Sequence, residues 1–171
     1  MTRVVLSIGS NLGDRLGHLQ SVVDGLGAAV RGVSPVYETA AWGGVEQGPF
    51  LNAVVIADDP SLGCRDWLRL GQELERAADR RREIHWGPRT LDVDVIACHD
   101  GADEVSSGDE VLTLPHPYAH QRAFVLAPWL AVDPDATLRV DGTPRPVSQL
   151  LAALDAAERD GVRLVTPVLV S

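Results

Sequence analysis

Lysine is missing from this chain of 171 residues, and all 15 of its basic residues are arginine. Because a G-x-x-x-x-G-K-[ST] phosphate loop and a Schiff base both need a lysine amine, the sequence excludes both kinds of site. Acidic residues outnumber basic ones by 24 to 15, a net charge of -9, which argues against general binding to nucleic acid or to anionic membranes. Any phosphate-binding site in this chain must therefore be built on arginine.

Cysteine and long apolar runs are also scarce. Cys64 and Cys98 lie beside apolar residues and fit no zinc or redox spacing, so we expect reduced, mostly buried thiols of the kind found in the cytoplasm. The sequence has no run of about 18 apolar residues that would cross a membrane, and its N-terminal apolar run is too short for a secretory signal. We expect one domain over residues 1–171, monomeric and cytoplasmic, large enough to bury a core of its own.

Hydrophobic periodicity predicts alternating strands and helices. Runs rich in β-branched residues indicate strands, apolar residues three and four positions apart indicate helices, and glycine or proline clusters separate the two. The expected order is strand 3–8, helix 16–30, strands 33–39 and 50–57, helix 61–79 and strand 91–95. This βαββαβ order is typical of the ferredoxin-like α+β fold, a mainly antiparallel sheet flanked by helices. The expected C-terminal additions are an acidic exposed loop at 99–110, helices at 119–130 and 147–157, and a strand at 162–170.

Asp92 and Asp94 are two carboxylates in an apolar, strand-forming run. Because successive side chains of a strand alternate between faces, both point to one face, roughly 7 Å apart, while Leu91, Val93 and Val95 point to the core. At an effective dielectric near 20 their repulsion costs on the order of 2 kcal/mol, which bound cations would offset. Mg²⁺ suits this pair, since it takes one or two protein carboxylates together with water and substrate phosphates. The alternative is a strand with one solvated face.

Arginine is concentrated just before this strand, with five of the 15 arginines between Arg76 and Arg89. The guanidinium fork matches phosphate and stays charged at any working pH. A solvated helix end, where cations complement the helix dipole, is the alternative interpretation. Arg89 lies three residues before Asp92, so a polyphosphate bound by arginine would also reach the metal site.

Four further residues are candidates for binding. Phe50 and Phe124 are the only phenylalanines; each fits an ordinary core position, but a flat heteroaromatic substrate would also fit between them. Asn52 shares the strand face of Phe50 and is placed to hydrogen-bond the edge of such a ring. His116, held between two prolines, is a candidate phosphate ligand, although a lone histidine is more often structural.

The chain resembles a known family through four motifs in the same order. The motifs are Ile8-Gly9-Ser10-Asn11-Leu12, Phe50-Leu51-Asn52-Ala53, Trp86 to Asp94, and Pro115-His116 followed by Arg122-Ala123-Phe124. They resemble those of the 6-hydroxymethyl-7,8-dihydropterin pyrophosphokinases of folate biosynthesis, over about Val4 to Leu151. The resemblance implies that the terminal pyrophosphate of ATP is transferred to the hydroxymethyl group of the pterin, with release of AMP.

The same resemblance implies roles for individual residues. Asp92 and Asp94 would hold two Mg²⁺ ions that bridge the phosphates of the co-substrate ATP, and Arg80, Arg82 and Arg89 would complete the catalytic set. The implied ATP-binding residues are Gln72, Glu75, Arg89, Thr113, His116 and Arg122. The implied pterin-binding residues are Thr39, Ala40, Trp42, Phe50, Asn52, Trp86, Asp92 and Phe124, with the two phenylalanines on either side of the ring. Where family members can carry an aromatic residue after the histidine, this chain has Pro117 and then Tyr118.

Two other functions fit part of the pattern. A metal-dependent nucleotidyl- or glycosyltransferase would also use an Asp-x-Asp pair near arginines, and a nucleotide-binding regulatory module would need the arginines but not both aspartates. The fold alone does not distinguish them. The product does: AMP indicates pyrophosphoryl transfer, a nucleoside diphosphate indicates glycosyl transfer, and binding without turnover indicates a regulatory module.

Overall fold

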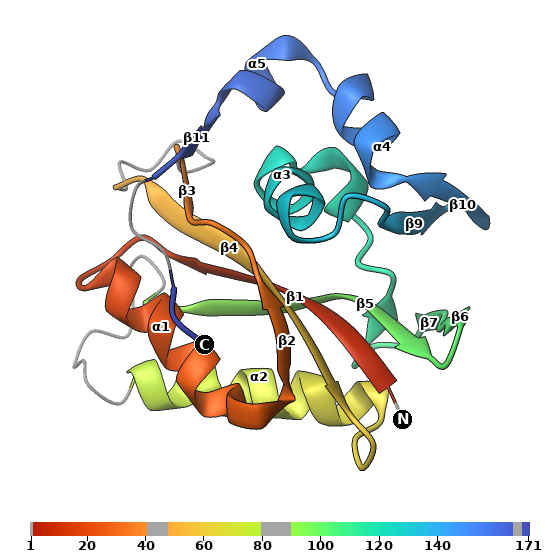
Figure 1. The fold of residues 1–171 in the computed structure, drawn as a ribbon, viewed down its shortest axis with the longest axis horizontal. Coiled ribbons are helices and arrows are strands. Elements are labelled where there is room, and N and C mark those ends of the chain that lie inside the picture. The colour runs from red at the N-terminus through yellow and green to blue at the C-terminus, as the bar shows by residue number, and fades with distance from the viewer. Residues whose placement is uncertain (1, 41–47, 80–89, 166–168) are drawn as a thin grey trace.

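The first apolar run of the sequence forms the central strand of the fold. A computed structural model describes residues 2–40, 48–79, 90–165 and 169–171. In it β1 (Thr2–Ser10) pairs antiparallel with β4 (Phe50–Asp59) on one side and with β5 (Asp92–Asp100) on the other (Figure 1). The sheet order is β11-β3-β4-β1-β5-β6, with β2 also paired to β4. This arrangement confirms the predicted α+β fold and its mainly antiparallel sheet.

Helices cover both faces of this sheet. Helices α1 (Arg15–Leu26) and α2 (Cys64–Asp79) lie on one face, and α3 (Ala123–Val132) and α4 (Val147–Ala153) lie on the other (Figure 1). Because successive side chains of a strand point to opposite faces, each strand contributes to a core on both sides of the sheet. Leu6 of β1 packs toward α1 and α2, while its neighbour Val5 packs toward α3. A cavity lies in the layer between the sheet and the segment that leads into α3.

The remaining elements are short and lie mostly at the edges of the sheet or in the C-terminal part. They are η1 (Gly27–Ala29), β2 (Val30–Val33), β3 (Tyr37–Thr39), β6 (Asp103–Glu104), β7 (Ser107–Gly108), β8 (Thr113–Leu114), η2 (Ala119–Gln121), β9 (Thr137–Val140), β10 (Thr143–Pro146), α5 (Ala156–Asp160) and β11 (Val162–Leu164). None of the helices in the described ranges is both long enough and apolar enough to cross a membrane.

Several predicted boundaries were wrong for local reasons. The strand predicted at 33–39 is divided into β2 and β3, because Pro35 has no N–H to give to the ladder. At this break the Ser34 N–H donates to the Val54 carbonyl at 2.9 Å, and the Ser34 Oγ accepts from the Val54 N–H at 2.8 Å. The helix predicted to reach residue 30 ends at Leu26, because Gly27 takes a positive φ of 56°.

The C-terminal predictions also need correction. The acidic segment 99–110 contains the end of β5 and the short strands β6 and β7, so it is not simply a loop. The helix predicted at 119–130 is a 3₁₀ turn followed by α3, and the one at 147–157 is divided into α4 and α5. The strand predicted at 162–170 is β11, which ends at Leu164.

The two cysteines form a disulfide that connects the start of α2 with β5, so the expectation of reduced thiols was wrong. The Cα atoms of Cys64 and Cys98 are 6.0 Å apart, and Cys98 is fully buried. Their separation in sequence gave no sign of this bond, because the packing of α2 against β5 brings the two residues together. Both belong to the core on the face of the sheet that α1 and α2 cover.

Candidate active site

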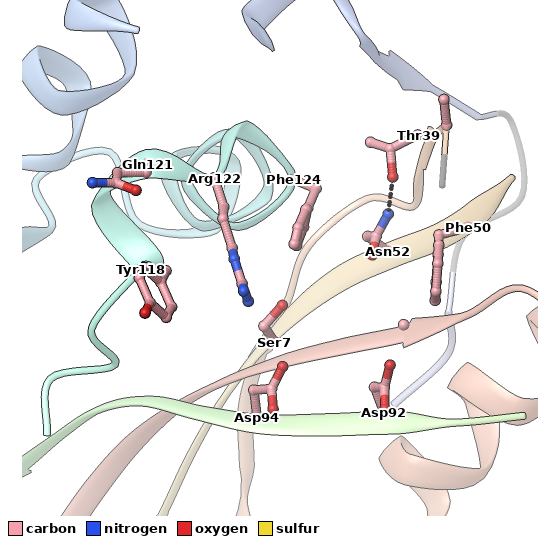
Figure 2. Close-up of a pocket in the computed structure, with 12 residues that line it drawn as sticks. Ser7, Thr39, Phe50, Asn52, Asp92, Asp94, Tyr118, Gln121, Arg122 and Phe124 are labelled. Carbon is pink, nitrogen blue, oxygen red and sulfur yellow. Dashed lines mark hydrogen bonds between the residues drawn. The ribbon is translucent and has the colours of Figure 1, made fainter. Parts of the chain in front are cut away.

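A cavity of about 490 Å³ lies between the sheet and the segment that leads into α3. Its lining combines residues of β1, β3, β4 and β5 with residues of η2 and α3, and Figure 2 shows them converging on one space. The lining residues are Ser7, Gly9, Thr39, Ala40, Phe50, Asn52, Asp92, Asp94, Tyr118, Gln121, Arg122 and Phe124.

The floor of the cavity follows from strand alternation on three neighbouring strands. Each strand contributes two residues at a spacing of two: Ser7 and Gly9 from β1, Phe50 and Asn52 from β4, and Asp92 and Asp94 from β5. In the ladder Gly9 is opposite both Asn52 and Asp92, and Ser7 is opposite Asp94. The two carboxylates therefore share the cavity face, as the Asp-x-Asp pattern predicted, while Val93 and Val95 are buried in the core beneath.

Asn52 is fixed by a hydrogen bond inside the cavity. Its Nδ2 donates to the Thr39 Oγ1 at 2.7 Å, and only 4% of the residue is exposed. Its other amide atom, Oδ1, lies 3.0 Å from the point where a Cβ of Gly9 would be. The amide thus has a defined orientation beside a floor residue that carries no side chain, and a flat ring can approach the backbone there.

Arg122 and Phe124 form the wall opposite the sheet. Figure 2 shows Arg122 between the rings of Tyr118 and Phe124, and Phe124 on the side that faces Phe50. The Arg122 Cζ lies 5.6 Å from the Tyr118 ring centroid and 5.5 Å from that of Phe124. The guanidinium forms no hydrogen bond or ion pair with another residue in the described part of the chain. Its donors remain available for an anionic ligand that enters from the cavity.

His116 lies close to this wall but does not line the cavity. Its backbone N–H donates to the Ile96 carbonyl on β5 at 2.9 Å, and its Nδ1 accepts from the Tyr118 N–H at 3.2 Å. Burial lowers the pKa of the imidazole below its ordinary value, the Asp94 carboxylate opposes this shift, and Arg122 adds to it. The ring is therefore neutral at pH 7, with its proton on Nε2 because Nδ1 is an acceptor.

Other predicted residues lie outside the cavity or outside the described ranges. Gln72 and Glu75 are on α2, which covers the opposite face of the sheet, and Thr113 is an exposed residue of β8. The predictions for Trp42, Arg80, Arg82, Trp86 and Arg89 fall outside the residues that the structure describes.

Four lining residues were not predicted: Ser7, Gly9, Tyr118 and Gln121. The period of two that placed the aspartates on one face would also have placed Ser7 and Gly9 on a common face of β1. Tyr118 and Gln121 belong to an irregular turn, where no period indicates the direction of a side chain.

The sequence of residues 5–134 matches the family model described as 7,8-dihydro-6-hydroxymethylpterin-pyrophosphokinase (HPPK). The chain belongs to this family. A 2-amino-4-hydroxy-6-hydroxymethyldihydropteridine pyrophosphokinase of Mycobacterium tuberculosis (strain ATCC 25618 / H37Rv) is 62% identical over 172 residues, covering 98% of this chain and 92% of that one. The HPPK of Mycobacterium leprae (strain TN) is 61% identical over 175 residues (99% and 92%), and that of Aquifex aeolicus (strain VF5) is 32% identical over 137 residues (79% and 82%).

Solved structures agree with this HPPK fold. A crystal structure of Plasmodium falciparum HPPK-DHPS wild type aligns with a TM-score of 0.63 at 13% identity, covering 87% of this chain and 43% of that one. This likeness concerns the fold alone. The family match and the close relatives show that the chain is an ATP-dependent pyrophosphokinase that transfers pyrophosphate to hydroxymethyldihydropterin in folate biosynthesis. The transferase and regulatory-module alternatives are thereby set aside.

Proposed function

We propose that the cavity between the sheet and α3 is where this HPPK reaction takes place. One observation carries the proposal: a pair of carboxylates on β5 and an arginine on the opposite wall share a cavity that also holds both phenylalanines of the chain. An aromatic substrate and a polyphosphate with its cations have complementary subsites there.

The pterin subsite is the space between Phe50 and Phe124. A flat heteroaromatic ring stacks favourably between two aromatic rings, and each such contact adds about 0.5–1.5 kcal/mol beyond the buried area. Asn52, held by Thr39, is placed to read the ring edge, and Gly9 leaves the floor flat. Ala40, next to Thr39 in the chain, also lines the cavity. The hydroxymethyl group of a pterin in this position would be directed toward β5.

Asp92 and Asp94 fit a site for two Mg²⁺ ions. Their oxygens are hard ligands, and no cluster of three or more His, Cys, Asp or Glu side chains occurs among the residues with defined positions, so phosphate and water oxygens would supply the other ligands. When bound, Mg²⁺ would neutralise phosphate charge and lower the pKa of the attacking alcohol. The two carboxylates hold this charge next to the pterin subsite.

The cationic wall binds the phosphates. The Arg122 guanidinium donates from the side opposite the carboxylates, and the neutral His116 is able to donate through Nε2 to a phosphate oxygen. Arg80, Arg82 and Arg89 add charge to the catalytic set, and Trp42 and Trp86 complete the pterin subsite. Gln72, Glu75 and Thr113 lie outside the cavity and contact the part of the nucleotide that extends beyond it. The family resemblance supports these further assignments.

The proposed chemistry is one in-line displacement. The pterin hydroxymethyl oxygen forms a bond to the β-phosphorus of ATP, the bond from that phosphorus to the α–β bridging oxygen breaks, and AMP leaves with the bridging oxygen while the alcohol loses its proton. We further propose that the enzyme acts as a monomer in the cytoplasm. The chain buries two hydrophobic cores of its own, which supports the monomer, and the use of ATP supports the location.

The first experiment incubates the protein with ATP, Mg²⁺ and 6-hydroxymethyl-7,8-dihydropterin, and resolves the nucleotides by chromatography. AMP should appear in equal amount with the pterin diphosphate. Asp92→Asn and Asp94→Asn should each lower the rate by about 100-fold or more, since a preorganised charge at the reacting centre is lost. Asp135→Asn, at an exposed position after α3, is the matched control. Equal AMP formation by the β5 variants would contradict the assignment of the metal site.

A further inference from the structure

Tyr118 is an aromatic residue of the cavity lining to which the proposed function gives no role. The residue is 56% exposed, although its neighbour Ala119 is fully buried and aromatic side chains generally contribute most when they are buried. Its hydroxyl makes no hydrogen bond within the described ranges. Neither core packing nor a structural hydrogen bond accounts for a tyrosine here.

The backbone around Tyr118 is held in a hydrogen-bonded turn. The Tyr118 N–H donates to the His116 Nδ1 at 3.2 Å, and the Tyr118 carbonyl accepts from the Gln121 N–H at 3.0 Å. One residue on, the Arg122 N–H donates to the Ala119 carbonyl at 3.2 Å. These bonds place Tyr118 and Arg122, the residue immediately before α3, in one turn.

Among the described residues, the one charged group in contact with the Tyr118 ring is Arg122. The guanidinium lies at similar distances from Tyr118 and Phe124, 5.6 and 5.5 Å from the ring centroids, both within the range of a cation–π interaction. Figure 2 shows the order Tyr118, Arg122, Phe124 along the wall of the cavity. Phe124 faces the pterin subsite on its other side, whereas the Tyr118 ring contacts the guanidinium and, edge-on with centroids 6.2 Å apart, the ring of His116.

We propose that Tyr118 is a positioning residue that holds the Arg122 guanidinium in place for the phosphates of ATP. An arginine side chain has many rotamers, and ordering it on ligand binding costs free energy. Two flanking rings restrict Arg122 before ATP arrives, and no salt bridge within the described residues competes for its donors. This inference rests on the proposed function of the cavity. It gives the exposed Tyr118 ring a part in nucleotide binding without any contact to the substrate.

The test compares Tyr118→Ala and Tyr118→Phe in steady-state kinetics and in calorimetric binding of a non-hydrolysable ATP analogue with Mg²⁺. Tyr118→Ala should raise the KM and the Kd for the nucleotide by about threefold to fivefold, the effect of an exposed cation–π contact, with an unchanged KM for the pterin. Tyr118→Phe keeps the ring and should restore wild-type nucleotide binding. His120→Ala, in the same turn but outside the cavity lining, controls for local disturbance of the backbone.

A double-mutant cycle with Arg122→Gln separates positioning from direct contact. If Tyr118 acts through Arg122, Tyr118→Ala should cause no further loss of analogue binding in the Arg122→Gln background. A full additional loss in that background, a loss in Tyr118→Phe equal to that of Tyr118→Ala, or an equal loss in His120→Ala would each overturn the inference. Absence of AMP from the wild-type reaction would instead mean that the proposed function fails. AMP formation together with unchanged nucleotide binding by Tyr118→Ala would overturn only the role of Tyr118.

Discussion

Gly9 lies directly opposite Asn52 in the β1–β4 ladder, and a Cβ atom at Gly9 would be 3.0 Å from the Asn52 Oδ1. The same atom would be 3.6 Å from the ring of Phe50. A side chain at this position would therefore press on the amide proposed to read the pterin and would rise from the floor on which the ring lies. The absence of a side chain at Gly9 is part of the shape of the pterin subsite.

Gly9→Ala should weaken pterin binding more than ATP binding. Adding a methyl group to a filled site typically costs 1–3 kcal/mol, and we expect the KM for the pterin to rise by about tenfold, which corresponds to about 1.4 kcal/mol. Steady-state kinetics with each substrate varied in turn measures this. Gly108→Ala is the matched control, because a Cβ there has nothing within 4 Å. A pterin KM at the wild-type value in Gly9→Ala would contradict the flat-floor interpretation.

Thr39→Val should disorient the Asn52 amide without changing the size of the side chain. The substitution removes the oxygen that accepts from the Asn52 Nδ2 at 2.7 Å and leaves that N–H unpaired in a site that is almost fully buried. Because a buried unpaired donor costs about 1–3 kcal/mol, the pterin Kd should rise by about tenfold. Thr39→Ser should restore binding, and Thr143→Val, on the exposed strand β10, should have no effect. Titration of the pterin by fluorescence or calorimetry decides the matter.

The sequence predicted the parts of the molecule that depend on periodic burial. The alternation around Asp92 and Asp94 placed both carboxylates on the correct face, because a strand with one buried face has only one register that fits its core. The order of strands and helices was confirmed for the same reason, apart from the division of the second predicted strand into β2 and β3. Boundaries such as the break at Pro35 were missed. The Ser34 side chain replaces a backbone hydrogen-bond partner there, and the spacing of apolar residues in the sequence gives no sign of such a replacement.

Contacts between distant segments could not be predicted from spacing. The disulfide depends on the packing of α2 against β5, which brings together residues that no local motif connects. The contact of Tyr118 with Arg122 depends on a 3₁₀ turn, whose geometry is set by hydrogen bonds to β5 and within the turn rather than by a hydrophobic pattern. The family resemblance found Arg122 and Phe124 but gave no role to a tyrosine displaced by one position.

His116 should make the stability of the protein fall on acidification. Burial, opposed by Asp94 and reinforced by Arg122, lowers the pKa of the folded-state imidazole below its ordinary value of 6.5. The unfolded chain therefore binds a proton at a higher pH than the folded chain, so stability is complete above pH 6.5 and decreases as the pH falls toward the folded-state pKa.

Urea unfolding at a series of pH values below neutrality measures this effect. His116→Gln, which cannot titrate, should show a smaller decrease in the free energy of unfolding on acidification than the wild type does. His120→Gln is the control and should keep the wild-type decrease. An equally large decrease in His116→Gln would show that other groups cause the acid sensitivity.

The Cys64–Cys98 disulfide should stabilise the fold without taking part in the reaction. Both cysteines belong to the core on the face of the sheet opposite the cavity, and their bond closes a loop that contains most of α2. A loop of this size, with a sequence separation of 34, is expected to contribute about 4 kcal/mol, mainly by restricting the unfolded chain. Cys64→Ser, at the more exposed partner, should lower the Tm of the oxidised protein by about 8 to 15 °C. Adding dithiothreitol should bring the wild type to the Tm of the variant, while the rate of AMP formation at 25 °C stays the same. Two titratable thiols in the denatured, untreated protein would contradict the bond, and a loss of activity on reduction would show that α2 and β5 transmit its effect to the site.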